Sequence, residues 1–346
     1  MPNKQRYLTL DGMRGVAALL ILVRHNDIYF GKFRFNESFL AVDLFFVLSG
    51  FVVAGAYSER LRQGLNWRSF MLLRLVRFYP LYLLGTLLGL AAMLGGMLFG
   101  RVGEQVTYAE IGASLTLNVF FIPSFFMRDL FPLLTVAWSL FWELLVNFAY
   151  SQVWPSLSRK RLLALLACSA LSLILAATRC VVDSGSAPGL DSAWMAATRV
   201  VFSFGMGLLL QRMPKADFRV PPVLLLGASA IALGFNPQGD FRPLYEICFI
   251  LLISPALVYL GAASEPKNGL EARLYAFLGA VSYALYVLHK PIGLLLSIAF
   301  KHLVHVGVAH FAPWSGLVLI AVLLAICGIL DRYYDGPARR WLLTKV

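Results

Sequence analysis

The sequence predicts an all-α membrane protein, a polytopic helical bundle with about ten transmembrane helices and with both the N- and C-termini in the cytoplasm. Of the 346 residues, 59% are hydrophobic and only 14% are charged, whereas a soluble chain carries about a quarter charged residues. The apolar residues also gather in runs close to the ~20 residues that cross a bilayer. A soluble globular enzyme is therefore excluded. We expect a single membrane-embedded domain over residues 1–346, with no additional soluble domain.

Ten apolar runs are the expected spans, and the run at 220–234 is the shortest of them. The stretch 107–122 is apolar enough for a short helix, but it carries Glu110 and Asn118. We expect it to form an outer-face or re-entrant helix instead of crossing the membrane. The expected spans are 8–27, 37–57, 78–99, 133–153, 161–178, 194–211, 220–234, 243–262, 275–299 and 314–331.

The basic residues set the expected orientation. The chain has 30 Lys and Arg against 18 Asp and Glu, a net charge of +12, and basic residues collect in the cytoplasmic loops of membrane proteins. If 107–122 crossed the membrane, the cluster Arg159, Lys160 and Arg161 would lie outside. Ten spans keep this cluster inside. In a chain of this hydrophobicity the positive excess indicates membrane lipids as partners and no nucleic acid.

Cysteines and histidines in the loops predict no metal site. The four cysteines show no CxxC spacing and fall in or beside apolar runs, so they support neither a metal site nor a disulfide framework. His302, His305 and His310 have a spacing that suits a metal, but no other ligand type accompanies them. We interpret them as residues of a solvated loop.

Ionisable residues inside the spans mark the candidate site, because such residues usually face a cavity or a partner. Arg14 and His25 are eleven residues apart, which places them on nearly one helix face and about 16 Å apart along the axis. Asp43 lies in the outer half of the second span, within reach of His25 in depth, where a carboxylate fixes an imidazole tautomer. Snorkelling of Arg14, an interfacial His25 and a salt bridge from Asp43 to Arg14 or Arg34 are the open alternatives.

A pair of arginines begins the third span. Arg74 and Arg77 are three residues apart and share a helix face. Two guanidinium groups on one face suit a phosphate or a carboxylate, although arginines at a membrane surface also bind lipid headgroups. Pro80 indicates a kink or the start of the helix.

Polar residues recur in the fourth and ninth spans. Glu143 lies near the middle of the fourth span, one turn after Ser139, and a glutamate at mid-membrane is difficult to explain by packing alone. Tyr286 and His289 lie near one face of the ninth span. Pro291 is expected to break that helix.

Five blocks of sequence together resemble the acyltransferase 3 family of bacterial integral-membrane O-acyltransferases. They are collinear over nearly the whole chain and read LDGMRGVAALLILVRH, FLAVDLFFVLSGFVV, RSFMLLRLVRFYPLY, AWSLFWE and VSYALYVLHKP. The resemblance implies transfer of an acyl group, with acetyl as the expected group, from cytoplasmic acyl-CoA to a hydroxyl of an extracytoplasmic or lipid-linked glycan. It also implies a multi-pass protein of the bacterial cytoplasmic (inner) membrane.

The resemblance assigns roles to residues of two motifs. The family's Arg-x10-His pair falls on Arg14 and His25, and its Arg-x-x-Arg motif falls on Arg74 and Arg77. The fourth block departs from the family pattern, in which paired acidic residues follow WSL, because a single Glu143 stands there in this chain. We expect Arg14, Arg74 and Arg77 to hold the acyl-CoA co-substrate by charge-assisted hydrogen bonds.

The expected catalytic residues are His25 as general base, Asp43 as its helper, and Glu143. A covalent route, in which His25 or Ser49 is acylated first, is also open. The residues expected to contact the substrate or the oxyanion are Ser139, Tyr286 and His289.

A proton-coupled transporter or flippase is the alternative function, because intramembrane His, Asp, Glu and Lys residues suit proton coupling equally well. Transporters often show duplicated halves with paired broken helices, and no such duplication is visible here. Release of CoA in the presence of an acceptor separates the two functions. The oligomeric state is left open.

Overall fold

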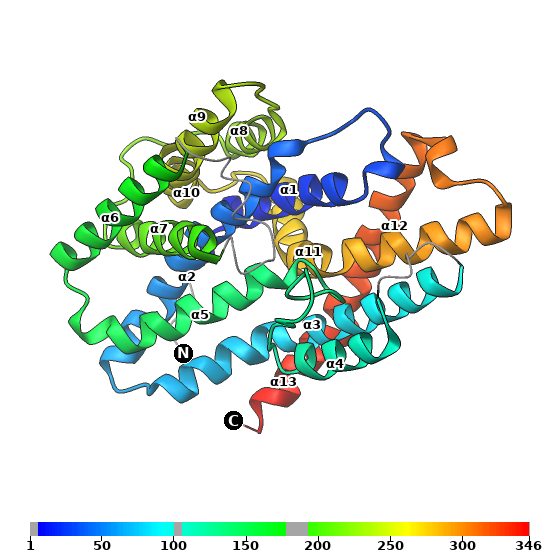
Figure 1. Cartoon of the computed structure of the whole chain (residues 1–346). Helices are drawn as coiled ribbons and strands as arrows, with labels where there is room; N and C mark the ends of the chain where they lie inside the picture. Colours follow the sequence, from blue (N-terminus) through cyan, green and yellow to red (C-terminus); the bar gives the residue numbers. More distant parts are fainter. Residues whose placement is uncertain (1–5, 100–105, 178–192, 346) are drawn as a thin grey trace.

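The computed structural model describes residues 6–99, 106–177 and 193–345, and every regular element in these ranges is a helix (Figure 1). The first half of the chain forms α1 (Leu8–His25), α2 (Ala41–Arg62), α3 (Trp67–Leu98), α4 (Tyr108–Val119), α5 (Ala137–Val153) and α6 (Arg159–Ala177). The second half forms α7 (Ala193–Gln211), α8 (Pro222–Gly234), α9 (Phe241–Cys248), α10 (Ser254–Ala263), α11 (Gly269–Val304), α12 (Trp314–Leu330) and α13 (Gly336–Leu343).

A helix occupies each of the ten ranges that hydropathy predicts. Within the described residues, seven helical stretches are long and apolar enough to span a membrane. The three others are α1, which carries several charges, and α5 and α8, which have 17 and 13 residues. The seven are Asn36–Arg62, Trp67–Leu98, Arg159–Ala177, Ala193–Gln211, Phe241–Ala263, Gly269–Val304 and Trp314–Leu343. The chain is therefore all-helical and of multi-pass membrane type, while ten crossings and cytoplasmic termini stay predictions.

Helix α3 begins earlier than the predicted span at 78–99. The side chain of Asn66 accepts a hydrogen bond of 2.8 Å from the backbone N–H of Ser69, which caps the first turn at Trp67. Pro80 lies inside the helix and does not start it. Arg74 and Arg77 therefore lie on a regular helix, and their side chains are fixed relative to one another.

Helix α11 is one continuous helix from Gly269 to Val304. Asn268 caps its start by accepting a hydrogen bond of 2.7 Å from Glu271 N. The prediction that Pro291 breaks this helix is wrong, since Pro291 lies buried within it. A proline removes one backbone hydrogen bond, and a helix that is packed on both sides of that position stays intact.

The stretch 107–122 forms the short helix α4 and a turn that leads into an inserted loop, residues 120–136. Twelve residues of α helix are about 18 Å long, less than the ~30 Å hydrocarbon core. The phenol of Tyr82 donates to the Asn118 carbonyl, which fixes α4 against α3. The inserted loop then packs between α3 and α11, where Leu133 and Leu134 are buried. Gly89 lies against the Leu133 carbonyl, and a side chain there would displace this loop.

Two helix pairs form the centre of the bundle: α1 packs along α11, and α2 packs along α7. Gly50 of α2 lies against the Phe204 carbonyl, and Gly207 of α7 lies against the Val47 carbonyl. Small residues allow such close backbone approach, so these two glycines let α2 and α7 pack tightly.

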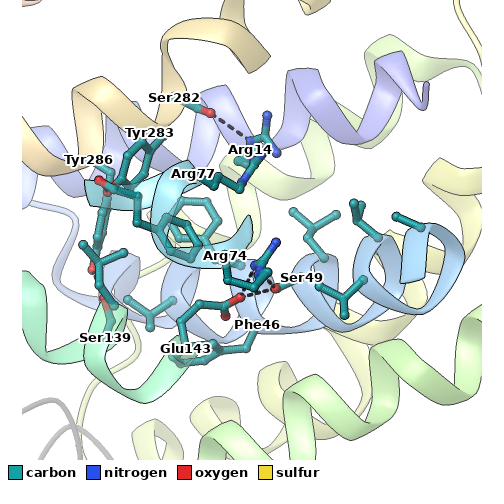
Figure 2. A pocket seen from close by; sticks show the side chains of 18 of the residues that line it. Arg14, Phe46, Ser49, Arg74, Arg77, Ser139, Glu143, Ser282, Tyr283 and Tyr286 are labelled. Carbon is teal, nitrogen blue, oxygen red and sulfur yellow. Dashed lines mark hydrogen bonds and ion pairs between the residues drawn. The ribbon is translucent and has the colours of Figure 1, made fainter. Parts of the chain in front are cut away.

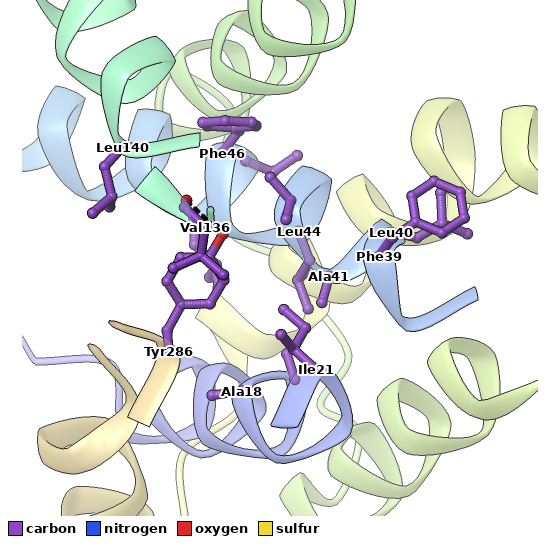
Figure 3. Close-up of a cluster of buried hydrophobic side chains, with 14 of the residues drawn as sticks. Ala18, Ile21, Phe39, Leu40, Ala41, Leu44, Phe46, Val136, Leu140 and Tyr286 are labelled. Atoms are coloured by element: carbon purple, nitrogen blue, oxygen red, sulfur yellow. Dashed lines mark hydrogen bonds between the residues drawn. The ribbon is translucent and has the colours of Figure 1, made fainter. Parts of the chain in front are cut away.

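The apolar core lies where these two pairs meet α5. Figure 3 shows Ala18 and Ile21 of α1, Leu44 and Phe46 of α2, and Leu140 of α5 around one space. All five are buried. This cluster holds α1, α2, α5 and α11 together, and these helices, with α3, carry the polar residues of the candidate site.

Candidate active site

A pocket of about 960 Å³, counting the part that opens to solvent, lies between α1, α2, α3, α5 and α11 (Figure 2). Its apolar walls come mainly from α2, and its polar groups come from the other four helices and from Ser49 and Tyr57 of α2. The polar lining residues, counting the tyrosines, are Arg14, Ser49, Tyr57, Arg74, Arg77, Ser139, Glu143, Ser282, Tyr283 and Tyr286. Six of the nine residues expected in the site therefore line one pocket, and the other three (His25, Asp43 and His289) lie elsewhere.

Arg74 and Glu143 pair with one another inside the pocket. Arg74 Nη2 lies 2.8 Å from Glu143 Oε1, and both side chains are buried. The Ser49 hydroxyl and the Asn147 amide also donate to Oε1. The buried Arg74 Nε atom has no hydrogen-bond partner among the described residues. Glu143 therefore acts on Arg74 as a counter-charge, and one donor of Arg74 is left over for a ligand.

Arg77 is the least occupied cation of the pocket. It lies one turn after Arg74 on α3, is exposed to the pocket space, and makes no ion pair with any of the described residues. Figure 2 shows its side chain pointing into the space between Arg14 and Arg74. A guanidinium in this position has five donors for an anionic ligand.

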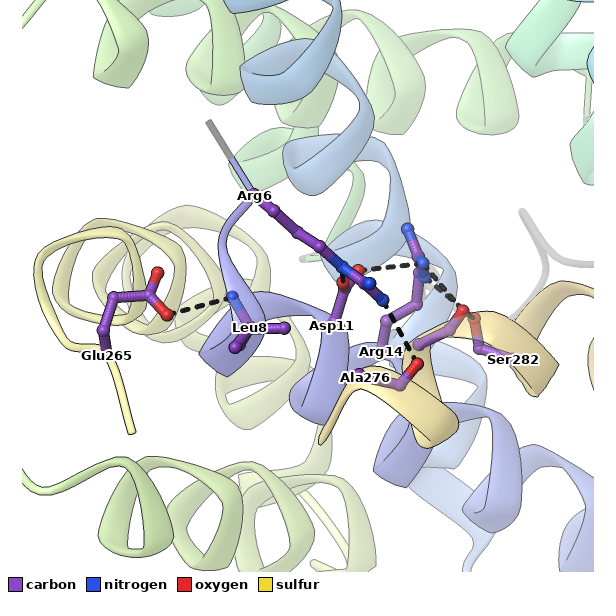
Figure 4. A network of polar contacts seen from close by, with 8 residues as sticks. Arg6, Leu8, Asp11, Arg14, Glu265, Ala276 and Ser282 are labelled. Carbon is purple, nitrogen blue, oxygen red and sulfur yellow. Dashed lines mark hydrogen bonds and ion pairs between the residues drawn. The ribbon is translucent and has the colours of Figure 1, made fainter. Parts of the chain in front are cut away.

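Arg14 is oriented by three contacts that leave it at the pocket wall. It contacts Asp11 at 3.0 Å and donates to the Ser282 hydroxyl at 2.8 Å and to the Gly279 carbonyl at 2.9 Å. Arg6 binds the second oxygen of Asp11 at 2.8 Å (Figure 4). This network fixes the start of α1 against α11.

A second contact fixes the same end of α1 from the other side. The Leu8 N–H donates to Glu265, in the loop before α11, at 3.2 Å. Partial burial raises the pKa of the Glu265 carboxyl above its usual range. The position of Arg14 at the pocket therefore depends on contacts that α1 makes along its first two turns.

Ser139 and Tyr286 close one end of the pocket. Their hydroxyl oxygens lie 2.7 Å apart, and Ser139 also donates to the Val136 carbonyl at 2.9 Å. The Tyr286 hydroxyl also lies 3.4 Å from the Val136 carbonyl, so either hydroxyl can be the donor of the Ser139–Tyr286 pair. Both hydroxyls belong to one hydrogen-bonded group in the pocket lining, and their contact with the substrate or the oxyanion stays a prediction.

His25 and His289 form a pair outside the pocket. His25 Nδ1 lies 2.8 Å from His289 Nε2, and the two rings are nearly parallel. His289 is fully buried, and its Nδ1 lies 2.9 Å from the Leu285 carbonyl oxygen. His25 is exposed. The Tyr286 ring lies 6.3 Å from the His289 ring, between this pair and the pocket.

Asp43 is bound to Arg199 of α7 and not to His25. Arg199 Nε lies 3.1 Å from one carboxylate oxygen of Asp43, and Nη2 lies 2.5 Å from the other. Both side chains are at most 2% exposed. The expected Asp43–His25 pair is therefore replaced by a buried bidentate ion pair that joins α2 to α7. Charged groups of opposite sign in two apolar spans were the sequence signal for it.

Comparisons with known proteins agree with the motif analysis. The family described as Acyltransferase domain matches residues 7–332. The chain is 38% identical to Protein 2 in picA locus of Rhizobium radiobacter over 50% of this chain and 95% of that protein. It is 23% identical to Acyltransferase MdmB of Streptomyces mycarofaciens over 99% of this chain and 94% of that protein.

A third relative is the Exopolysaccharide production protein ExoZ of Rhizobium meliloti, which is 28% identical over 89% of this chain and 93% of that protein. No solved structure matches the chain.

Proposed function

The chain belongs to the Acyltransferase domain family, and from this premise we propose that it is a membrane enzyme that transfers an acyl group from acyl-CoA to a hydroxyl of a glycan. We take acetyl as the acyl group and the bacterial inner membrane as the location. The name of the Rhizobium meliloti relative, which concerns exopolysaccharide production, supports a polysaccharide or its lipid-linked precursor as acceptor.

The observation that carries the proposal is the cationic pocket. It holds Arg14, Arg74 and Arg77 against the single carboxylate of Glu143, so its lining has an excess of positive charge. The phosphates of CoA are anionic and form strong, charge-assisted hydrogen bonds with guanidinium groups. Arg77 is the main phosphate ligand in this proposal, Arg14 is the second, and the unused Nε of Arg74 is the third.

Arg14 and His25 fix the distance over which the donor must reach. Eleven residues of α1 separate them, which is about 16 Å along the helix axis. This length is comparable with an extended pantetheine arm. The thioester reaches His25 when the Ser139–Tyr286 hydrogen bond opens, because these two residues stand at the end of the pocket nearest the histidine pair.

The reaction is a direct acyl transfer with His25 as general base. The acceptor hydroxyl oxygen attacks the thioester carbonyl carbon and forms the new C–O bond, while its proton passes to His25. The tetrahedral intermediate then breaks its C–S bond. CoA leaves as the thiolate and takes the proton from His25, which returns to its neutral form.

The test is release of free CoA by the purified full chain in detergent or nanodiscs. Acetyl-CoA is supplied with and without candidate glycan acceptors, and mass spectrometry of surface glycans from a deletion strain identifies the missing acyl group. Acceptor-dependent CoA release, lost in His25→Ala, is the expected result. Protein that moves a substrate across vesicle membranes and never releases CoA would instead show the transporter function.

A further inference from the structure

The contact between His25 and His289 fixes which nitrogen of His25 is basic. We propose that His289 is a positioning residue that holds His25 in one tautomer, with its Nε2 atom presented to the acceptor hydroxyl. This inference rests on the proposed function, in which His25 is the general base, and it assigns His289 a role other than contact with the oxyanion.

The chain of hydrogen bonds begins at a carbonyl oxygen, which only accepts. The Leu285 carbonyl lies 2.9 Å from His289 Nδ1, so Nδ1 carries the proton of that ring. In a neutral His289 the other nitrogen, Nε2, then has a lone pair and accepts. It lies 2.8 Å from His25 Nδ1, which must therefore donate.

His289 is neutral in this environment. Its side chain is 0% exposed, and no carboxylate contacts either ring among the described residues. A charged His289 would be a buried cation beside Lys290, and burial of an unpaired charge is strongly unfavourable. The relay therefore runs from His25 Nδ1–H to His289 Nε2, and from His289 Nδ1–H to the Leu285 carbonyl.

The geometry of the pair is maintained by neighbouring contacts at the end of α1. Tyr29 OH donates to the Gly293 carbonyl at 2.6 Å, and Asn26 Nδ2 donates to the His289 carbonyl at 3.4 Å. Gly293 has no side chain at a point where Asn26 comes very close. These contacts fix the end of α1 against α11, so the two rings meet in a defined register.

The consequence is a base whose reactive atom is set in advance. With Nδ1–H donated to His289, the lone pair of His25 lies on Nε2. This is the arrangement in which a carboxylate orients the histidine of a hydrolase triad, with a neutral histidine and a backbone carbonyl in place of the carboxylate. After proton transfer, the imidazolium keeps its Nδ1–H bond to His289.

Two substitutions at one position test the inference. His289→Leu removes the acceptor, and His289→Gln supplies an amide oxygen near the position of Nε2. We expect kcat to fall about 10²-fold in His289→Leu, the lower part of the range for a general base, with the KM for acyl-CoA unchanged. His289→Gln is expected to lie within about tenfold of the wild type, because it retains one acceptor.

A double-mutant cycle separates positioning from a general loss of folding. If His289 acts through His25, His289→Leu has no further effect on the residual activity of His25→Ala membranes. Equal losses in His289→Leu and His289→Gln, or the same fold loss in the His25→Ala background, would overturn the inference. A wild-type chain that never releases CoA would overturn the proposed function itself, which is a separate result.

Discussion

The pocket and the histidine pair lie along the same helix, α1, and are built from different groups. The pocket has three arginines and one glutamate in its lining, so it suits a negatively charged donor. The pair of His25 and His289 contacts no carboxylate among the described residues and contains no charge in its relay. In the proposed function, anion binding and proton transfer are therefore kept apart, since an imidazole must be neutral to accept a proton.

The largest expected effect comes from removing the base. His25→Ala should lower kcat by roughly 10²- to 10⁴-fold, the contribution of a general base, while acyl-CoA still binds in the pocket. The measurements are CoA release by steady-state kinetics and donor affinity by calorimetry. A loss of donor affinity as large as the loss of kcat would show that the pocket and the histidine pair act as one site.

The buried pair of Asp43 and Arg199 forms a third region, which we expect to act on stability and not on catalysis. Asp43→Ala takes away both carboxylate oxygens that Arg199 binds, and breaking a buried ion pair from one side costs about 3–5 kcal/mol. We expect a lower melting temperature in detergent and little folded protein at 37 °C.

The matched control is the double variant Asp43→Leu with Arg199→Met, which replaces the pair by apolar groups and should regain most of the stability. Its kcat per folded molecule should be close to that of the wild type. If the double variant is folded and as inactive as His25→Ala, Asp43 belongs to the catalytic group after all.

Removing Arg77, the proposed ligand of the acyl-CoA phosphates, is expected to have a smaller effect, and to change KM instead of kcat. Arg77→Ala should raise the KM for acyl-CoA by about 10- to 100-fold, which corresponds to the ~1.5–3 kcal/mol of a hydrogen bond to a charged group, with kcat nearly unchanged. Arg68→Ala removes an arginine of the same helix that does not line the pocket, and it should leave KM unchanged. The same KM in both variants would contradict the donor site.

The smallest effect is expected at α4, which lies away from both regions. Thr107 and Glu110 cap each other, and hydrogen bonds from the Thr107 backbone and side chain lower the pKa of Glu110. A lowered pKa gives stability that is present at neutral pH and is lost as the pH falls through the folded-state pKa. Thr107→Ala should shift the melting temperature by a few degrees at most and leave kcat and KM unchanged.

Hydropathy predicted where the helices lie because each apolar run must be kept out of water, and one helix does this for each run. The Arg74–Arg77 face was also accessible from sequence, since both residues lie on one helix and the 3.6-residue period fixes their relation. The first residues of α3 and α11 could not be predicted from hydropathy, because helical turns capped by Asn66 and Asn268 precede the apolar runs.

Contacts between distant helices could not be derived in the same way. The sequence offered several cations at the membrane depth expected for Asp43. Asp43 pairs with Arg199 because α2 packs along α7 at Gly50 and Gly207. His25 meets His289, 264 positions away, only because α1 packs along α11. A single sequence indicates that a buried charge needs a partner, but it does not indicate which helix supplies it.

The hydrogen bond between Ser139 and Tyr286 has a consequence for the hydrolysis of acyl-CoA when no acceptor is bound. A thioester that rested beside an activated base and water would be hydrolysed, with loss of acyl-CoA and no product. Both hydroxyls line the pocket, and the Tyr286 ring lies 6.3 Å from the His289 ring, so in the proposed function they stand between the donor and the histidine pair. In the proposed function, this hydrogen bond keeps the thioester away from His25 until the acceptor is present, and so limits idle hydrolysis.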